Sequence, residues 1–373
     1  MGYRALYLHI PFCRSKCLYC DFDSSACGSS HDALDRYVNR LIDRVHACGA
    51  DSELSEIETV YIGGGTPSLA GDGLVELVRA VRTYCDPHEF TCEANPESFT
   101  DLLSRRLFQA GVSRASIGVQ SLVPDELAAI GRIHGPGQAL AAIAAAKRAG
   151  MSVSCDLMCG LPGQTVESWR STLERILAAP EAPDHFSVYP LQLEEGTPLE
   201  ALERSGCVTV PDEDFQAACM EIASDILSSA GYRRYEVASY ALPGHRCRHN
   251  IAYWTGVSYL GLGRSAAGML DLGAEGRIRM RQLDDEGSRF EREELTCREA
   301  LAEDLMLACR MVDGMPPALL GRAARTLPAP ALRDAVDRAV SSGLARWEGG
   351  SLVPTRRGWL EGNELFGLFW DLA

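Results

Sequence analysis

The sequence predicts an α/β protein: a partial (β/α)6 barrel of the TIM type followed by a small winged-helix-like domain. The first observation is a strand-then-helix unit that recurs about every thirty residues through the first half of the chain, the span of a βαβ step. The second is that this repeat stops after Leu191. The third is a C-terminal run of helices and a Gly-Gly hairpin. Six parallel units close most of a barrel.

Each strand of the repeat is a short apolar run, and each helix carries apolar residues on one face. We expect strands at residues 4–9, 59–62, 90–93, 115–119, 153–158 and 186–189. Capping residues and terminal glycines mark where the helices begin and end. We expect helices at residues 32–48, from the N-cap residue Asp72, from the cap Thr100 to Gly111, at 138–149 before Gly150, and from Thr165.

Beyond the repeat the pattern changes twice. A helix at 212–230 and a strand at 235–240 lead into a loop rich in His, Asn, Tyr, Trp and Gly. Thr296 then opens a helix with Glu299 as its capping-box partner. Helices near 317–324 and 331–342 and a hairpin at Gly349-Gly350 follow. We therefore divide the chain into residues 1–200, the partial barrel; 201–292, a barrel extension with that loop; and 293–373, the winged-helix-like domain.

The composition excludes several classes of partner. The chain carries 36 basic and 51 acidic residues, a net charge of −15, whereas nucleic-acid binding needs a basic face. The same charge disfavours docking on anionic lipid. No apolar run approaches the roughly 20 residues that span a bilayer, and His9 and Pro11 interrupt the N-terminus too early for a signal peptide. We expect a soluble, cytoplasmic monomer or homodimer.

Three of the 14 cysteines are spaced for metal chemistry. Cys13, Cys17 and Cys20 form C-x3-C-x2-C, one thiolate short of the four that usually hold a cubane cluster. The missing ligand leaves one iron open to the amine and carboxylate of a small molecule. Structural zinc is the alternative, but it needs four closed ligands, and no second C-x-x-C pair occurs elsewhere. Most other cysteines lie in apolar patterns typical of buried thiols.

Polar residues follow the predicted strands at one common edge. The second strand ends in Gly63-Gly64-Gly65-Thr66-Pro67, whose backbone can approach a ligand closely. The other strand ends carry Glu93, Gln120, Asp156 and Tyr189. One such residue is often only a helix cap, but a run of them beside a cysteine motif indicates an active-site rim, because strand ends converge there in β/α barrels.

These motifs give the sequence a recognisable family resemblance. The residues concerned are the C-x3-C-x2-C loop and residues 63–67, 93–97, 118–121 and 156–165. With them the chain resembles, over nearly its whole length, the radical S-adenosylmethionine (SAM) family of oxygen-independent coproporphyrinogen oxidases, HemN, and their relatives. The resemblance implies a [4Fe–4S] cluster held by Cys13, Cys17 and Cys20.

The resemblance also implies the residues that meet SAM. They are Tyr7, Tyr19, Gly64, Gly65, Thr66, Glu93, Gln120, Arg132 and Asp156. Among them, Glu93 is expected to bind the amino group, Arg132 the carboxylate and Asp156 the ribose. One acid, one guanidinium and backbone donors suit a zwitterionic amino acid.

Two departures from HemN favour the HemW branch of this family, which is regarded as a group of heme chaperones. HemN has a further cysteine one residue after the third cluster ligand, where this chain has Asp21-Phe22, and a longer N-terminal segment. Residues 249–254, His-Asn-Ile-Ala-Tyr-Trp, resemble the H-N-x-x-Y-W signature of that branch. The motif offers His249 as an axial heme ligand and aromatic faces for a porphyrin. The alternative is a packed loop whose histidine binds a backbone carbonyl. Cys247 is expected to be a buried thiol rather than a second ligand.

The resemblance therefore implies a protein that binds heme, a [4Fe–4S] cluster and SAM and hands heme to target proteins. Two enzymatic alternatives remain open: an oxygen-independent coproporphyrinogen III oxidase and a HemN-like radical SAM methyltransferase. The sequence does not decide whether SAM is cleaved, and it assigns no catalytic residue.

Overall fold

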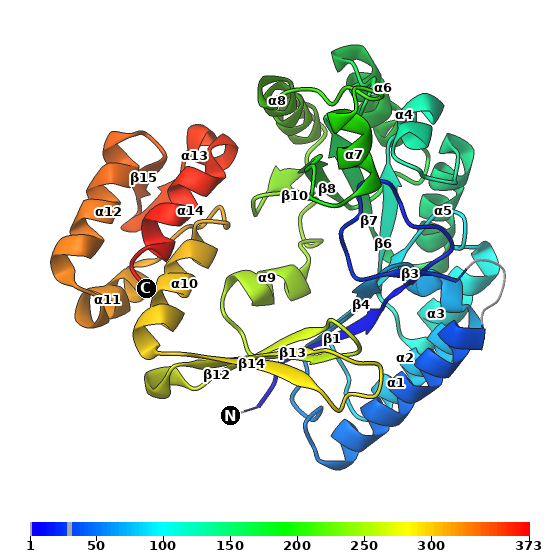
Figure 1. The fold of residues 1–373 in the computed structure, drawn as a ribbon, viewed down its shortest axis with the longest axis horizontal. Coiled ribbons are helices and arrows are strands. Elements are labelled where there is room, and N and C mark those ends of the chain that lie inside the picture. Colours follow the sequence, from blue (N-terminus) through cyan, green and yellow to red (C-terminus); the bar gives the residue numbers. More distant parts are fainter. Residues whose placement is uncertain (1, 28–31) are drawn as a thin grey trace.

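The computed structural model describes residues 2–27 and 32–373. In this part of the chain, a twelve-stranded sheet curls into a partial barrel (Figure 1). Its centre consists of neighbouring parallel strands: β1 (Ala5–Ile10), β4 (Thr59–Gly64), β5 (Glu89–Ala94), β6 (Arg114–Gln120), β7 (Ser152–Cys159) and β8 (His185–Pro190). The strands follow one another in sequence order, which confirms the predicted (β/α)6 partial barrel.

Helices cover the outer face of this sheet (Figure 1). They are α1 (Asp32–Ala50), α2 (Asp72–Arg82), α3 (Asp101–Ala110), α4 (Pro124–Ala129), α5 (Pro136–Ala149) and α6 (Val166–Leu177). The Thr100 hydroxyl accepts a hydrogen bond from the Leu103 amide at 3.2 Å, so the expected cap is confirmed. Gly111 and Gly150 end α3 and α5 in the left-handed conformation, as expected. Asp72, however, is the first helical residue and Gly71 holds the cap position.

The sheet continues past β8 through short antiparallel strands. Helices α7 (Pro198–Arg204) and α8 (Glu213–Ser229) precede them, and Asp212 caps α8 as its side chain accepts from Phe215 N. The pairing strands are β9 (Arg233–Arg234) and β10 (Ser239–Ala241). The predicted strand at 235–240 was therefore mostly wrong. Tyr235 belongs to no strand. Its side chain is fully buried, and its hydroxyl shares a hydrogen bond with His185 Nε2 at 2.9 Å.

The segment predicted as a loop is also structured. Residues of the His-Asn-Ile-Ala-Tyr-Trp motif form helix α9 (Arg248–Trp254). Strand β11 (Tyr259–Leu262) then adds in parallel to β1, and β12 (Ala267–Asp271), β13 (Arg277–Gln282) and β14 (Phe290–Leu295) extend the sheet antiparallel. Near the N-terminus, β2 (Phe12–Cys13) pairs with β3 (Ser25–Ala26). Figure 1 shows α9 on the concave side of the sheet, away from the outer helices.

The C-terminal module has an apolar core of its own. It contains α10 (Cys297–Ala308), α11 (Pro317–Thr326), α12 (Ala329–Ser341), the hairpin β15 (Ala345–Glu348) and β16 (Ser351–Pro354), α13 (Arg356–Leu360) and α14 (Gly362–Trp370). Its core residues run from Leu301 to Leu372. The module meets the sheet through Arg277 of β13, which is nearly fully buried and pairs with Asp304 of α10 at 2.6 Å and with Glu303. Among the described residues, no helix has the length and apolar character needed to cross a membrane.

We predict that Leu305→Ala destabilises the C-terminal module selectively. Leu305 is fully buried in its core, and removing a buried leucine side chain costs about 2–5 kcal/mol. Amide hydrogen exchange should therefore accelerate in α10, α12 and α14 and stay slow in β4 to β7. Leu320→Ala, a change at a partly buried position of the same module, is the control. Equal acceleration in the parallel strands would contradict a separate core.

Candidate cofactor site

A cavity of about 480 Å³ lies where the parallel strands end. The sequence-predicted residues that line it are Cys13, Cys17, Tyr19, Cys20, Gly64, Gly65, Glu93, Gln120, Arg132 and Asp156. Thr66 is instead buried behind the cavity, and Tyr7 lines a neighbouring one. The fold thus gathers most of the expected residues from the ends of β4, β5, β6 and β7 and from the segment that follows β1, because parallel strand ends share one rim.

Backbone hydrogen bonds fix the loop that carries the cysteines. The Gly65 amide donates to the Ile10 carbonyl at 2.9 Å, and the Leu18 amide donates to the Ile130 carbonyl at 3.0 Å. Gly65 lies so close to the loop that an added Cβ would be 2.6 Å from the Phe12 carbonyl oxygen and 2.9 Å from Cys13 Sγ. The glycine at this position is therefore required by the close approach of the loop.

The three thiols line one cavity, so one cluster can share them as ligands. Burial raises the pKa of Cys13 and Cys20, and Arg132 Nη1 donates to Cys17 Sγ at 3.6 Å.

Asn95 fixes the orientation of Arg132. Its Oδ1 accepts from Arg132 Nη2 at 2.9 Å, and its Nδ2 donates to Thr66 Oγ1 at 2.8 Å. Arg132 Nη2 also donates to the Gly118 carbonyl. Sequence reasoning missed Asn95, although it stands two residues after Glu93 in a motif that was singled out. The sequence feature that could have identified Asn95 is its place two residues after Glu93, an acidic residue near the end of a predicted strand.

Glu93 is a buried carboxylate with donors already in place. Its Oε1 accepts from the Tyr61 hydroxyl at 2.8 Å and its Oε2 from the Gly64 amide at 3.0 Å. Burial raises the pKa of Glu93 to about 7, although these two donors oppose the rise. The side chain is therefore only partly ionised near neutral pH, and a further N–H donor beside it would favour the ionised form.

Serines on neighbouring strands hold Asp156. Ser116 Oγ donates to Oδ2 at 2.9 Å and Ser154 Oγ donates to Oδ1 at 3.0 Å. Burial raises the pKa of Asp156, and the serine hydroxyls oppose this rise. Sequence reasoning missed these serines. The sequence feature that could have identified them is the alternation of side chains along β6 and β7. It directs Ser116 and Ser154 to the same face of the sheet as Asp156.

Gln120 adopts a strained backbone at the rim. Its φ is +64°, in the left-handed region that non-glycine residues rarely occupy, and it is buried. The strain coincides with a bulge in the pairing of β6 with β7. Bulges re-aim side chains next to functional sites, and this one directs Gln120 into the cavity.

His249 does not present an open ligand. Its side chain is 0% exposed; Nδ1 shares a hydrogen bond with Thr59 Oγ1 at 2.9 Å, and Nε2 shares one with the Tyr253 hydroxyl at 3.1 Å. Burial lowers the pKa of His249 to about 3, so the ring is neutral. Both nitrogens are occupied, and the geometry does not fit axial ligation of iron. Trp254 lies against Arg310, with 5.2 Å between the guanidinium and the ring. Cys247 is a buried thiol, as expected.

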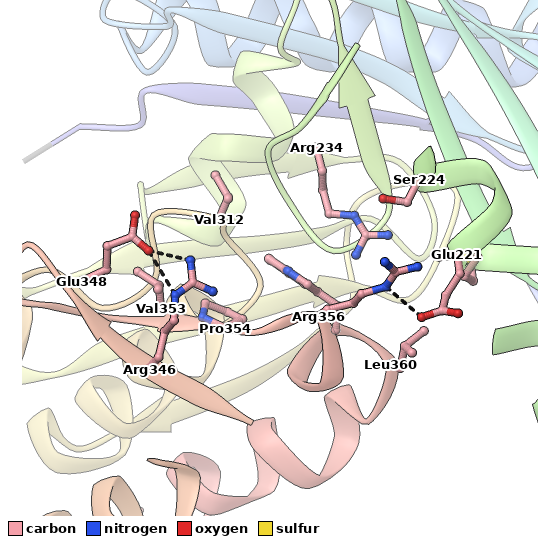
Figure 2. Close-up of a pocket in the computed structure, with 12 residues that line it drawn as sticks. Glu221, Ser224, Arg234, Val312, Arg346, Glu348, Val353, Pro354, Arg356 and Leu360 are labelled. Atoms are coloured by element: carbon pink, nitrogen blue, oxygen red, sulfur yellow. Dashed lines mark hydrogen bonds and ion pairs between the residues drawn. The ribbon is translucent and has the colours of Figure 1, made fainter. Parts of the chain in front are cut away.

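A further cavity of about 310 Å³ lies between α8 and the C-terminal module (Figure 2). Its charged residues are largely paired with one another: Arg356 Nε contacts Glu221 at 2.8 Å, and Arg346 Nη2 contacts Glu348 at 2.5 Å. It lies apart from the rim of the parallel strands, and none of the residues singled out from the sequence lines it. The strand-end cavity is therefore the candidate site.

Comparison with known proteins identifies the family. The Radical SAM superfamily model matches residues 7–176. A protein named heme chaperone HemW from Mycobacterium tuberculosis is 33% identical over 95% of this chain and 91% of its own length. A protein of the same name from Bacillus subtilis is 30% identical over 98% and 99%. The chain belongs to the HemW family of radical SAM proteins.

The fold agrees with a solved relative. The structure of coproporphyrinogen III oxidase, HemN, from Escherichia coli superimposes with a TM-score of 0.81, covering 99% of this chain and 90% of HemN at 20% identity. HemN and this HemW-family chain thus share one architecture, including the C-terminal module. At this level of identity the likeness concerns the fold alone.

We predict that Cys13→Ala/Cys17→Ala/Cys20→Ala abolishes anaerobic reconstitution of a [4Fe–4S] cluster. The three thiols line one cavity and are the iron ligands that the motif supplies. Iron and sulfide analysis with visible absorption measures the outcome. Cys27→Ala is the control, because Cys27 Sγ donates to the Cys13 carbonyl at 3.4 Å and does not line the cavity. A triple variant that still binds four irons would refute the assignment.

We predict that SAM affinity rises with pH through about 7. An ionised Glu93 is the better acceptor for the N–H groups of the SAM amino group, and protonating it below its pKa of about 7 costs affinity, up to roughly tenfold per pH unit. Calorimetric titration between pH 6 and 8 measures this slope. Glu93→Gln should bind SAM roughly tenfold more weakly at pH 8 and lose the slope. An unchanged slope in the variant would remove Glu93 from the site.

Proposed function

We propose that this protein is a heme chaperone that carries a SAM-loaded [4Fe–4S] cluster and passes heme to target proteins. The observation that carries the proposal is the similarity to HemW proteins over 95–98% of the chain. It covers the cysteine loop, helix α9 and the C-terminal module together. The fold likeness to HemN does not favour the oxidase, because it rests on 20% identity.

The strand-end cavity supports the cofactor part of the proposal. Cys13, Cys17 and Cys20 would hold three irons of the cluster, and the open iron would accept the amino-acid end of SAM. When bound, such a cluster would supply redox chemistry beside the sulfonium of SAM. The residues of this chain provide the rest: Glu93 would accept a hydrogen bond from the amino group, and Arg132, oriented by Asn95, would bind the carboxylate.

The other SAM contacts follow the same cavity. Asp156, fixed by its two serines, would bind the ribose hydroxyls. Gly64, Gly65 and Tyr19 would lie along the methionine part, and Gln120 would line the site. Thr66 would act through Asn95 rather than by contact, because it is buried behind the cavity and bonded to that amide. Tyr7 lines the neighbouring cavity and would face SAM only from the side of Tyr61.

We predict that the reconstituted protein binds hemin with a saturable Soret shift and does not convert coproporphyrinogen III in the presence of SAM and dithionite. A chaperone needs a heme site but no turnover. Spectroscopic titration and chromatography of the porphyrins measure the two outcomes.

Each alternative function has its own signature in this experiment. A decarboxylated porphyrin would select the oxidase, and a methylated product would select a methyltransferase. Either product, or the absence of hemin binding by the wild-type protein, would contradict the chaperone proposal.

A further inference from the structure

We propose that the cavity between α8 and the C-terminal module, called the interdomain cavity, binds a carboxylate that carries an apolar body, and that Arg234 is its anchor (Figure 2). The interdomain cavity has a volume of about 310 Å³, which is at the lower end of the usual range for sites that bind small molecules. It shares no lining residue with the strand-end cavity. The inference is therefore independent of the proposed heme function.

Arg234 of β9 is held in place with one edge of its guanidinium group free. Its Nε donates to the Tyr240 hydroxyl at 2.9 Å, and its Nη2 donates to the same hydroxyl. On the side of the C-terminal module, the guanidinium carbon lies 5.3 Å from the centre of the Trp359 ring. These contacts fix the group and use the edge formed by Nε and Nη2. The edge formed by Nη1 and Nη2 remains available for a ligand in the cavity.

The charged residues of the interdomain cavity leave one positive charge without a partner. Arg356 Nε pairs with Glu221 at 2.8 Å, and Arg346 Nη2 pairs with Glu348 at 2.5 Å. Arg234 is the other charged residue of the lining, and it forms no ion pair within the part of the chain that the structure describes. A carboxylate can bind a guanidinium edge through two parallel hydrogen bonds. The free edge of Arg234 therefore suits a carboxylate.

Apolar side chains form much of the remaining wall. They are Met220, Val312, Val353, Pro354, Trp359 and Leu360. Leu360 is 40% exposed, so part of this apolar surface faces water. An inorganic anion would leave it there, whereas a carboxylate with an apolar body would cover it and gain the free energy of its burial. Ser224 of α8 adds a hydroxyl on the barrel side of the cavity, the side from which Arg234 also comes.

Binding of 4-phenylbutyrate to the reconstituted full-length protein tests the site. Calorimetry is done with SAM present, so that the strand-end cavity is occupied, and saturable binding is expected. The neutral 4-phenylbutyramide and inorganic phosphate should each bind at least roughly tenfold more weakly, because the amide lacks the charge and phosphate lacks the apolar body. Amide hydrogen exchange should slow in α8, β16 and α13 when the acid binds, and it should stay unchanged in β4 to β7.

A second arm of the experiment identifies the source of the carboxylate. A free monocarboxylate and a glutamate flanked by apolar residues in a partner protein present the same chemistry. The blocked peptide Ac-Phe-Glu-Phe-NH2 is titrated beside Ac-Phe-Gln-Phe-NH2. Binding of the glutamate peptide alone of these two supports the site and indicates a protein segment. Binding of 4-phenylbutyrate without either peptide supports the site and indicates a free acid.

Substitutions locate the anchor. Arg234→Gln should weaken 4-phenylbutyrate binding at least roughly tenfold, and Arg234→Lys should weaken it less, because lysine keeps the charge but loses the two-pronged contact. The matched control is Arg233→Gln, the same change at the neighbouring exposed position of β9, which does not line the cavity. Unchanged SAM affinity shows that the variants are folded.

Filling the cavity tests the site without removing the arginine. Ser224→Phe should prevent binding of 4-phenylbutyrate, since its ring occupies the space of the ligand. Ser228→Phe, one turn further along α8 at an exposed position outside the cavity, should bind the acid as the wild type does. The proposal is overturned if neither the acid nor the glutamate peptide binds, or if the amide or phosphate binds as tightly as the acid. Wild-type affinity in Arg234→Gln or in Ser224→Phe would overturn it as well.

Discussion

The buried carboxylate of Glu89 determines where helix α9 lies, and the interior of the barrel depends on it. A helix of seven residues is not stable alone, and its first amides need acceptors. Glu89, at the start of β5, supplies them from a position 160 residues earlier in the chain. The N-terminal end of α9 is thereby fixed on the concave side of the sheet, where its side chains can reach the cavities. His249, Asn250 and Tyr253 then contribute to the cavity walls, while Trp254 turns toward the C-terminal module.

This placement divides the interior of the barrel into two compartments. One is polar and holds the cysteines, Glu93, Arg132 and Asp156. The other is aromatic and neutral apart from Glu93. Tyr61 and Glu93 belong to both, and their hydrogen bond at 2.8 Å forms part of the partition. A ligand that charges Glu93 in the polar compartment would strengthen this bond, since a carboxylate is a better acceptor than a carboxylic acid. The two compartments therefore share Tyr61 and Glu93 in their common wall.

The sequence predicted the elements whose signals are local. Strand ends, the Thr100 and Thr296 caps and the glycine stops were found because each depends on a few neighbouring residues. Helix α9 and strands β11 to β14 were missed because their stability comes from distant partners. Nothing near His249 reveals the carboxylate of Glu89 or the hydroxyl of Thr59. Some motif residues also proved to be scaffolding. Ser121 and Gln164 both donate to the buried carboxylate of Glu126, at 2.6 and 3.1 Å, and tie two motif segments together.

A protein that holds both a [4Fe–4S] cluster and heme carries iron at two separate places. An anomalous difference map at the iron absorption edge, from crystals of the reconstituted protein loaded with hemin, locates all the iron directly. A cluster peak is expected beside Cys13, Cys17 and Cys20, and a separate heme peak is expected inside the barrel. A heme peak on the outer surface, or in the cavity between α8 and the C-terminal module, would contradict this expectation.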